Sequence, residues 1–138
     1  MTGKPKNFHI GIKAVIQQEG RVLVLKDPRF NGVDLPGGKI DEGEGIEQAL
    51  KRELWEELGL KNFKQKELLH IFERKDYKGE NTSLMLAYYL VEAKIDKIKL
   101  SSEHNGYEWV SAKDLKTLTK NGAFRNEGIK SVLTKVLK

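Results

Sequence analysis

The chain of 138 residues contains no cysteine and no long apolar segment. The absence of cysteine excludes a disulfide scaffold, a cysteine nucleophile, an iron–sulfur centre and any zinc site built on thiolates. The longest apolar run, residues 84–91, is eight residues long, whereas a membrane helix needs about 20. The first seven residues are polar and basic, and no apolar signal region follows them. We therefore expect a soluble, cytoplasmic protein with no membrane partner.

Enough apolar material is present for one ordinary core. Hydrophobic residues make up 38% of the chain and charged residues 33%, a balance that does not suit a disordered chain. The length agrees with the usual size of one domain, about 100–200 residues. We expect a flexible tail over residues 1–7 and a single domain over residues 8–138.

The net charge of +5 is unevenly distributed along the chain. Residues 41–60 hold seven acids against two bases, so the rest of the chain is strongly basic. A basic surface around one acidic spot could attract polyanions toward a group that neutralises the acids. The simpler interpretation, that lysine serves here as a solubilising surface residue, is favoured at this point.

Hydrophobic periodicity divides the domain into interleaved strands and helices. Strand patterns cover residues 8–17, 21–26, 67–73, 83–92, 98–100 and 107–110. Helical patterns cover residues 46–58, 111–118 and 129–137. Gly59 stands where a helix C-cap is expected, and Ser111 with Asp114 forms a capping-box pattern. A short turn separates the first two strands and predicts a hairpin, and the interleaving predicts an α/β or α+β domain.

The helix predicted over residues 46–58 carries acids on the face that should be buried. At about 100° per residue, its apolar stripe consists of Ile46, Ala49, Leu50, Leu54 and Leu58. Glu53 and Glu57 fall inside this stripe, and Glu56 falls at its edge. A surface helix should present its acids on the opposite side, so these three positions need an explanation.

The three acids are spaced i, i+3 and i+4, so their side chains converge on one patch. Close, partly desolvated carboxylates either take up protons or are joined by a cation. Oxygen ligands at this density suit a hard divalent ion, Mg²⁺ first and Mn²⁺ second. The alternative interpretation is an ordinary surface helix that carries salt bridges.

A glycine pair precedes the acidic segment. Gly37 and Gly38 allow tight backbone geometry and a close approach of the chain to a ligand, although Pro-Gly and Gly-Gly also occur in plain turns. Glu44 follows Gly38 after five residues. Seven residues further on begins the run Arg52-Glu53-Leu54-Trp55-Glu56-Glu57-Leu58-Gly59-Leu60. Every fixed position between residues 38 and 60 resembles the Nudix box, so the chain is identified as a member of the Nudix hydrolase family.

The resemblance implies both a fold and an activity. The implied fold is a Nudix-type α/β/α sandwich with a mixed β-sheet, in which the box forms a loop–helix–loop. The implied activity is metal-dependent hydrolysis of the diphosphate linkage in a nucleoside diphosphate derivative: a nucleoside triphosphate, a dinucleoside polyphosphate or a nucleotide sugar. Rival hydrolytic motifs are absent, since the sequence has no P-loop, no Gly-x-Ser-x-Gly elbow and no His-Glu-x-x-His.

Carried onto this chain, the resemblance also implies roles for individual residues. Glu53, Glu56 and Glu57 would be metal ligands and members of the catalytic set. The carbonyl of Gly37, just ahead of the box, would be a backbone ligand of the metal. Arg52 would orient a carboxylate.

Further roles concern the loops on either side of the helix. Glu44 would support its own loop or bind a second metal. The general base varies in this family, and Glu103 is favoured here because members often place an acid in this region; a box glutamate is the next candidate. His9 and His70 lie in predicted strands without partner spacing, so both are interpreted as structural residues.

Substrate contacts are expected from loop residues. Arg29, Phe30 and Tyr77 could stack on a nucleotide or pair with it, and Gly38 would let the substrate approach the backbone. A tyrosine near position 77 is similar to the pattern of dinucleoside polyphosphate hydrolases. Val33 takes the place of an aromatic residue that the family often has before its Pro-Gly-Gly, so base stacking by that route is not expected.

Two other functions stay open. An RNA 5′-end pyrophosphohydrolase is suggested by residues 111–138, which hold seven bases against two acids, although no aromatic platform accompanies these bases. A non-catalytic regulatory module that binds nucleotides is the second, and the intact box acids argue against it. Trp55 lies on the outer face of the predicted helix, where we expect it to meet the second helical layer or a partner chain, as in a homodimer.

Overall fold

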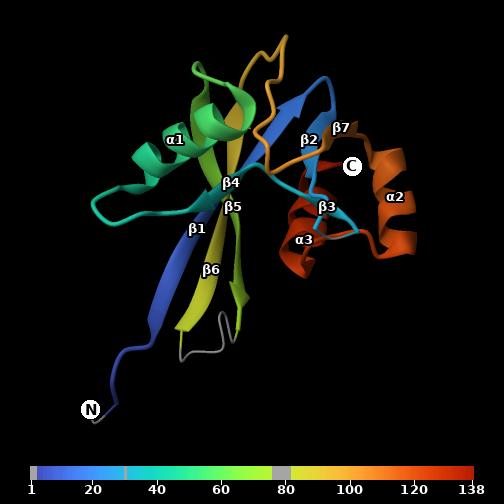
Figure 1. Ribbon diagram of the computed structural model, residues 1–138. Helices are drawn as coiled ribbons and strands as arrows, with labels where there is room; N and C mark the ends of the chain where they lie inside the picture. The colour runs from blue at the N-terminus through green and yellow to red at the C-terminus, as the bar shows by residue number, and fades with distance from the viewer. Residues whose placement is uncertain (1–2, 30, 76–81) are drawn as a thin grey trace.

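The computed structural model describes residues 3–29, 31–75 and 82–138, so Phe30 and Tyr77 lie outside the described residues. Within those ranges the chain forms seven strands and three helices (Figure 1). The strands are β1 (Asn7–Gln18), β2 (Arg21–Lys26), β3 (Val33–Asp34), β4 (Gly37–Lys39), β5 (Lys64–Arg74), β6 (Thr82–Glu92) and β7 (Gly106–Val110). The helices are α1 (Ile46–Leu58), α2 (Ala112–Asn121) and α3 (Glu127–Val136).

The strands form one mixed sheet built around β1. Its main order is β3-β2-β1-β6-β5, with β4 also paired to β1 and β7 to β2. β1 runs parallel to β6 and antiparallel to β2, which confirms the predicted hairpin. Residues 11–13 of β1 pair with β4, whereas residues 17–18 pair with β2. The sheet therefore splits along β1, and β4 and β2 diverge from this split.

Helices cover both faces of the sheet. The core on one face joins α1 to β1, with fully buried residues that include Ile12, Ala14, Ile16, Leu50 and Leu54. The core on the other face joins α2 and α3 to the strands, with residues that include Val15, Tyr88, Leu115, Ile129 and Leu133. Figure 1 shows α1 on one side of the sheet and α2 with α3 on the other. The predicted α/β/α sandwich with a mixed sheet is confirmed.

The predicted caps explain where the helices begin and end. α1 ends at Gly59, whose φ of 69° places it in the left-handed region that glycine adopts without strain. α2 begins after Ser111, whose side chain accepts a hydrogen bond from the backbone N–H of Asp114. α2 ends before Gly122, which is also left-handed.

Two expectations about local structure are wrong. Residues 98–100 form no strand, because the backbone N–H groups of Lys99 and Ser101 donate to the carbonyls of Leu58 and Glu57 at the end of α1. Ile46, expected in the buried stripe, is 43% exposed. It occupies the first position of α1, nearly one turn before the helix reaches the core.

Trp55 lies on the outer face of α1, as predicted, and is 52% exposed. The indole is in contact with Lys61, whose Nζ lies 5.1 Å from the ring centroid. The second helical layer lies on the opposite face of the sheet, so Trp55 does not meet it.

None of the helices in the described ranges has both the length and the apolarity that a bilayer crossing requires.

Candidate active site

The glycine pair of β4 lies against the centre of β1. Gly37 pairs with Lys13 and Gly38 with Ile12 in the ladder between the two strands. Gly37 has a φ of 134°, and a Cβ there would lie 2.8 Å from the Cα of Lys13. A Cβ on Gly38 would lie 2.6 Å from Cδ of Glu53. Glycine at these two positions therefore lets β4 pack on β1 and lets an acid of α1 reach the β4 backbone.

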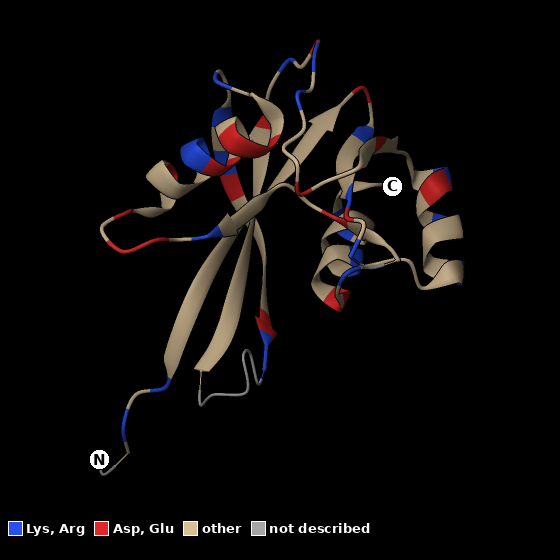
Figure 2. Ribbon diagram, viewed as in Figure 1, with Lys and Arg blue, Asp and Glu red and all other residues tan. Residues whose placement is uncertain are grey.

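The acids of α1 point where helical periodicity predicts. Glu57 is only 6% exposed, and the side chain of Glu53 is 13% exposed. The side chain of Glu56 is 55% exposed, in keeping with its place at the edge of the stripe. Figure 2 shows acidic residues gathered on α1 and on the loop before it. Two carboxylates thus face the sheet, and a third lies at the rim.

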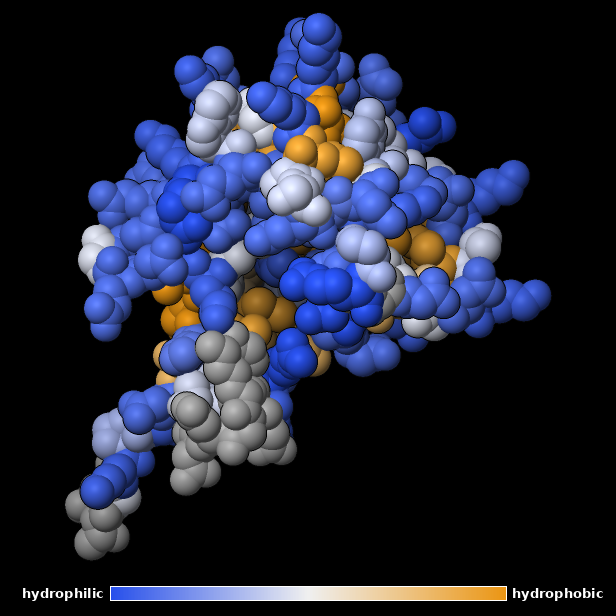
Figure 3. All heavy atoms as spheres, viewed as in Figure 1, coloured by the Kyte–Doolittle hydropathy of each residue, from blue (hydrophilic) through white to orange (hydrophobic). Residues whose placement is uncertain are grey.

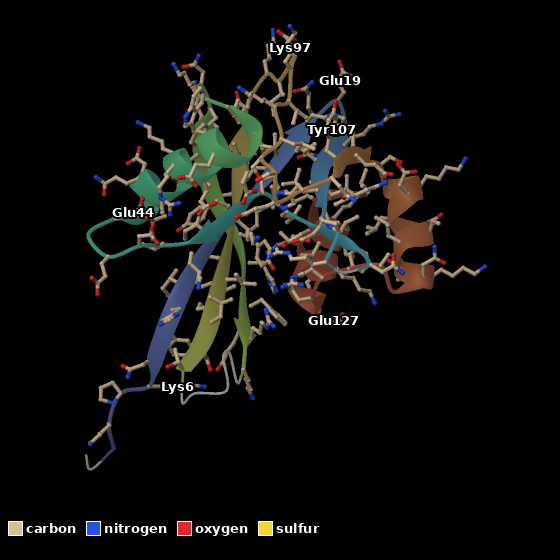
Figure 4. All side chains as sticks on the ribbon, viewed as in Figure 1. Lys6, Glu19, Glu44, Lys97, Tyr107 and Glu127 are labelled. Carbon is tan, nitrogen blue, oxygen red and sulfur yellow. The ribbon has the colours of Figure 1, made fainter. Side chains whose placement is uncertain are left out.

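Arg52 joins these acids to the preceding loop. Its Nε donates to Glu44 Oε2 at 2.7 Å and its Nη2 to Glu44 Oε1 at 2.9 Å. Its Nη1 donates to Glu53 Oε1 at 2.9 Å and to Glu56 Oε2 at 3.3 Å. Figure 4 labels Glu44 on the loop between β4 and α1. The hydrogen bonds favour the charged forms, so the pKa of Glu44 is lowered and the pKa of Arg52 is raised.

Glu57 is the most enclosed acid of α1. Its Oε2 accepts a hydrogen bond from the backbone N–H of Gly37 at 3.2 Å. Burial raises the pKa of Glu57 to about 8, while Lys13 and the Gly37 N–H act in the opposite direction and Glu53 adds to the rise. A carboxyl in this setting binds a proton near neutral pH unless a cation joins it.

Lys13 reaches the same glycine from β1. Its Nζ donates to the carbonyl of Leu35 at 3.1 Å, to Asp34 Oδ2 at 3.4 Å and to the carbonyl of Gly37 at 3.5 Å. The Gly37 residue is therefore bonded twice, its N–H to Glu57 and its carbonyl to Lys13. Sequence reasoning missed Lys13, although a lysine between apolar residues of a strand was a visible signal.

The carboxylates are not preassembled around a metal position. Within residues 3–29, 31–75 and 82–138, no group of three or more acidic or histidine side chains is arranged to hold a metal ion. Arg52 bonds to Glu53 and Glu56, and Glu57 is turned toward Gly37. The donor set nevertheless suits a divalent ion, because carboxylate and backbone carbonyl oxygens are hard ligands and a cation would stabilise the ionised form of the buried Glu57.

A cavity of about 220 Å³ opens beside Gly38. Leu84 and Leu86 contribute an apolar wall. Its polar lining comes from Lys13, Asp34, Lys39, Arg74, Arg125 and Asn126. On the face shown in Figure 3, hydrophilic residues surround the hydrophobic residues that are visible. Sequence reasoning did not predict that the cavity gathers four cations, because they come from four separate segments of the chain: Lys13, Lys39, Arg74 and Arg125.

Arg29 lines a different and larger cavity of about 630 Å³, which also touches α2 through Leu118. The Nε of Arg29 donates to Asp27 Oδ1 at 2.9 Å and to Oδ2 at 3.1 Å. Asp27 is buried, and Arg29 holds the pKa of that carboxyl well below its usual range. The structure thus does not place Arg29 in the lining of the cavity beside Gly38.

The loop that carries Glu103 is anchored to the end of α1. The backbone N–H of Ser101 donates to the carbonyl of Glu57 at 3.2 Å. Glu103 itself is exposed, and its charge acts on Arg29 and His104. Burial lowers the pKa of His104, whose Nδ1 has no hydrogen-bond partner among the described residues. The backbone of this loop is therefore tied to the last turn of α1, while the side chain of Glu103 is exposed.

Comparison with known proteins identifies the family of this fold and site. The family model described as NUDIX domain matches residues 7–131. The chain therefore belongs to the Nudix family. A solved relative, the MutT protein from Methanosarcina mazei Go1, shares the fold with a TM-score of 0.77 over 97% of this chain and 96% of that one, at 22% identity.

Two curated relatives are similar in sequence. The nucleoside triphosphatase NudI of Klebsiella pneumoniae (strain 342) is 34% identical over 128 residues, covering 80% of this chain and 87% of the relative. The 8-oxo-dGTP diphosphatase of Escherichia coli (strain K12) is 39% identical over 91 residues, covering 63% of this chain and 67% of the relative. This chain is a Nudix hydrolase, an enzyme that acts on phosphorus-containing acid anhydrides.

Proposed function

We propose that the chain is a metal-dependent pyrophosphohydrolase that converts nucleoside triphosphates to nucleoside monophosphates and pyrophosphate. The observation that carries this proposal is the meeting of the α1 acids, the Gly37-Gly38 backbone and a cavity with a cationic lining. The names of both curated relatives refer to nucleoside triphosphates, which supports this substrate class over dinucleoside polyphosphates and nucleotide sugars.

The carboxylates of α1 supply the proposed metal ligands. Glu53, Glu56, Glu57 and the carbonyl of Gly37 would hold Mg²⁺, with Mn²⁺ as the second choice. When bound, the ion supplies positive charge to the phosphate oxygens and lowers the pKa of a water. In this structure Arg52 bonds to both Glu53 and Glu56. With the ion bound, Arg52 would keep its hydrogen bond to Glu53 and release Glu56.

The reaction itself is the attack of water on phosphorus. A new P–O bond forms, the bond to the bridging oxygen breaks, and a proton passes from the water to a carboxylate. Glu103 is the proposed proton acceptor, and a box glutamate is the next candidate. The hydrogen bond between Ser101 and Glu57 fixes the backbone near Glu103 relative to α1.

The cavity beside Gly38 supplies the proposed site for the nucleoside end. Its apolar wall, Leu84 and Leu86, suits a base, and its cations suit phosphates. Asn126 Oδ1 already accepts hydrogen bonds from Tyr88 Oη at 3.1 Å and from the N–H of Ile129 at 3.2 Å. Its amide hydrogens are therefore the groups that Asn126 would offer to a ligand.

A substrate panel with matched variants tests the proposed function. Nucleoside triphosphates, dinucleoside polyphosphates and nucleotide sugars are assayed with Mg²⁺ or Mn²⁺ for released monophosphate, pyrophosphate and phosphate. Glu53→Gln and Glu57→Gln should each lower kcat by orders of magnitude, about 10²-fold or more, while circular dichroism shows an intact fold. Glu47→Gln, an exposed acid in the first turn of the same helix, is the matched control and should keep the parent rate.

Three results would count against this function. Turnover of Glu53→Gln or Glu57→Gln at the parent rate would remove the α1 acids from the mechanism. Equal activity with and without a chelator would show that the reaction needs no metal ion. Hydrolysis confined to nucleotide sugars or dinucleoside polyphosphates would keep the chemistry and overturn the proposed substrate class.

A further inference from the structure

Lys13 occupies an unusual place in the central strand. Residues 11, 12, 14, 15 and 16 of β1 are all buried, and Lys13 is the one charged residue among them. Its side chain is 13% exposed. Desolvating an ammonium group is costly, and a strand in the middle of a sheet usually carries an apolar residue at such a position. A charge retained there indicates a local function.

The contacts of Lys13 leave its charge only partly compensated. One acceptor, the carbonyl of Leu35, lies at 3.1 Å, whereas Asp34 Oδ2 and the carbonyl of Gly37 lie at 3.4 and 3.5 Å. Ammonium–carboxylate hydrogen bonds are usually shorter, about 2.7–2.9 Å. Asp34 also uses its Oδ1 to accept the backbone N–H of Leu35 at 2.7 Å. One ordinary hydrogen bond to a neutral carbonyl and two long contacts therefore hold the ammonium group, and a phosphate oxygen could replace the long ones.

The location of Lys13 relates it to both parts of the site. It lines the cavity beside Gly38, together with the apolar wall of Leu84 and Leu86. Its charge also acts on Glu57, the enclosed acid bonded to the N–H of Gly37. A diphosphate extending from the cavity to the α1 acids would pass the carbonyl of Gly37, where Nζ lies.

We propose that Lys13 is a substrate-contacting residue whose ammonium group leaves the Gly37 carbonyl and binds a phosphate oxygen of the substrate. The proposal rests on the proposed function and adds a residue outside the Nudix box to it. The ammonium approaches the diphosphate from β1, opposite the carboxylates of α1. It neutralises charge that develops as the bond to the bridging oxygen breaks.

Calorimetric binding of inorganic pyrophosphate in Mg²⁺ gives a readout that does not depend on turnover. Lys13→Met should weaken pyrophosphate binding about 10- to 100-fold, the loss expected when a hydrogen bond between charged groups is removed. Lys13→Arg keeps the charge and should recover part of the affinity. Lys66→Met removes an exposed lysine of β5 that pairs with Glu92, and it should bind like the parent.

A purely structural role for Lys13 predicts a different pattern. If Lys13 only neutralised Asp34, then Asp34→Asn should restore pyrophosphate binding to the Lys13→Met chain. The proposal predicts that the double variant Lys13→Met/Asp34→Asn still binds weakly, because the phosphate contact is still missing. In turnover assays, kcat/KM for the preferred nucleotide should fall by a similar factor in the single and the double variant. Thermal unfolding checks that each variant is folded.

The outcomes separate the two proposals. Parent-like binding and turnover by Lys13→Met, or rescue by Asp34→Asn, overturns the role of Lys13 and leaves the proposed function standing. A parent protein that binds pyrophosphate through Lys13 but hydrolyses none of the nucleotides overturns the proposed function and supports the contact. A parent that neither binds pyrophosphate nor hydrolyses nucleotides overturns both.

Discussion

Replacing Arg52 with methionine tests whether one guanidinium holds the acidic cluster together. The side chain bonds to Glu44, Glu53 and Glu56, and its Nη2 also donates to the carbonyl of Lys39 at 3.1 Å. Methionine retains the straight aliphatic stem and its helix propensity, so the change chiefly removes charge and donors. The three carboxylates then lose the guanidinium that joins them.

The size of the effect follows from the partial exposure of these groups. Breaking a fully buried ion pair costs about 3–5 kcal/mol, whereas exposed pairs contribute about 0–1 kcal/mol. The Arg52 side chain is 28% exposed, between those limits. We expect the free energy of unfolding to fall by about 2–3 kcal/mol, which lowers Tm by about 8–12 °C for a chain of this length.

Urea denaturation of the parent and the variant, with and without Mg²⁺, measures this effect. Without Mg²⁺ the Arg52→Met transition should move to lower urea at unchanged slope. Added Mg²⁺ should stabilise the variant more than the parent, because the ion no longer competes with the guanidinium for Glu56. Arg52→Lys, which keeps a charge but loses the fork of donors, should lie between them. A variant as stable as the parent in the absence of Mg²⁺ would refute the reasoning.

Three further predictions concern neighbouring residues. Asp27 has a lowered pKa in the folded state, so its contribution to stability is present above about pH 4 and is lost as the pH falls through the folded pKa. Asp27→Asn should therefore be less stable than the parent at pH 7 by urea denaturation, with a difference that shrinks below about pH 4; a constant difference would contradict this. Gly38→Ala should displace the Glu53 carboxylate, so kcat should fall while the circular dichroism spectrum is retained, and full activity would show that the contact is tolerated. Glu103→Gln should lower kcat about 10²-fold or more if Glu103 accepts the proton, and an unchanged rate would transfer that role to a box glutamate.

Local signals predicted the box helix well. The 3.6-residue period and Gly59 defined both ends of α1, and the same period predicted that Glu53 and Glu57 face inward. These features depend on neighbouring residues of one helix, so the sequence carries them directly. The strand predicted at residues 98–100, which the structure does not contain, shows the limit of such signals. Ile98 and Leu100 alternate as in a strand and pack on the α1 core, but their backbone meets the helix end instead of another strand.

The surroundings of the acids could not be predicted in the same way. Lys13 meets Gly37 only because residues 11–13 of β1 pair with β4 in one particular register. Arg74 and Arg125 reach the same cavity from β5 and from the segment before α3. Contacts between distant segments depend on the sheet topology, which strand periodicity does not specify. The sequence therefore predicted the acidic residues of the box. It did not predict the cations that line the cavity beside Gly38.

The hydrogen bonds from Lys99 and Ser101 to the last turn of α1 constrain how the site can open. These bonds occupy the carbonyls of Leu58 and Glu57, which a helix end would otherwise leave without a partner. Swinging the 99–105 segment outward as a flap would break both bonds beside the enclosed Glu57 carboxylate. Side chains around the cavity beside Gly38 can rearrange without breaking these two bonds. We therefore expect nucleotides to enter and leave through that cavity.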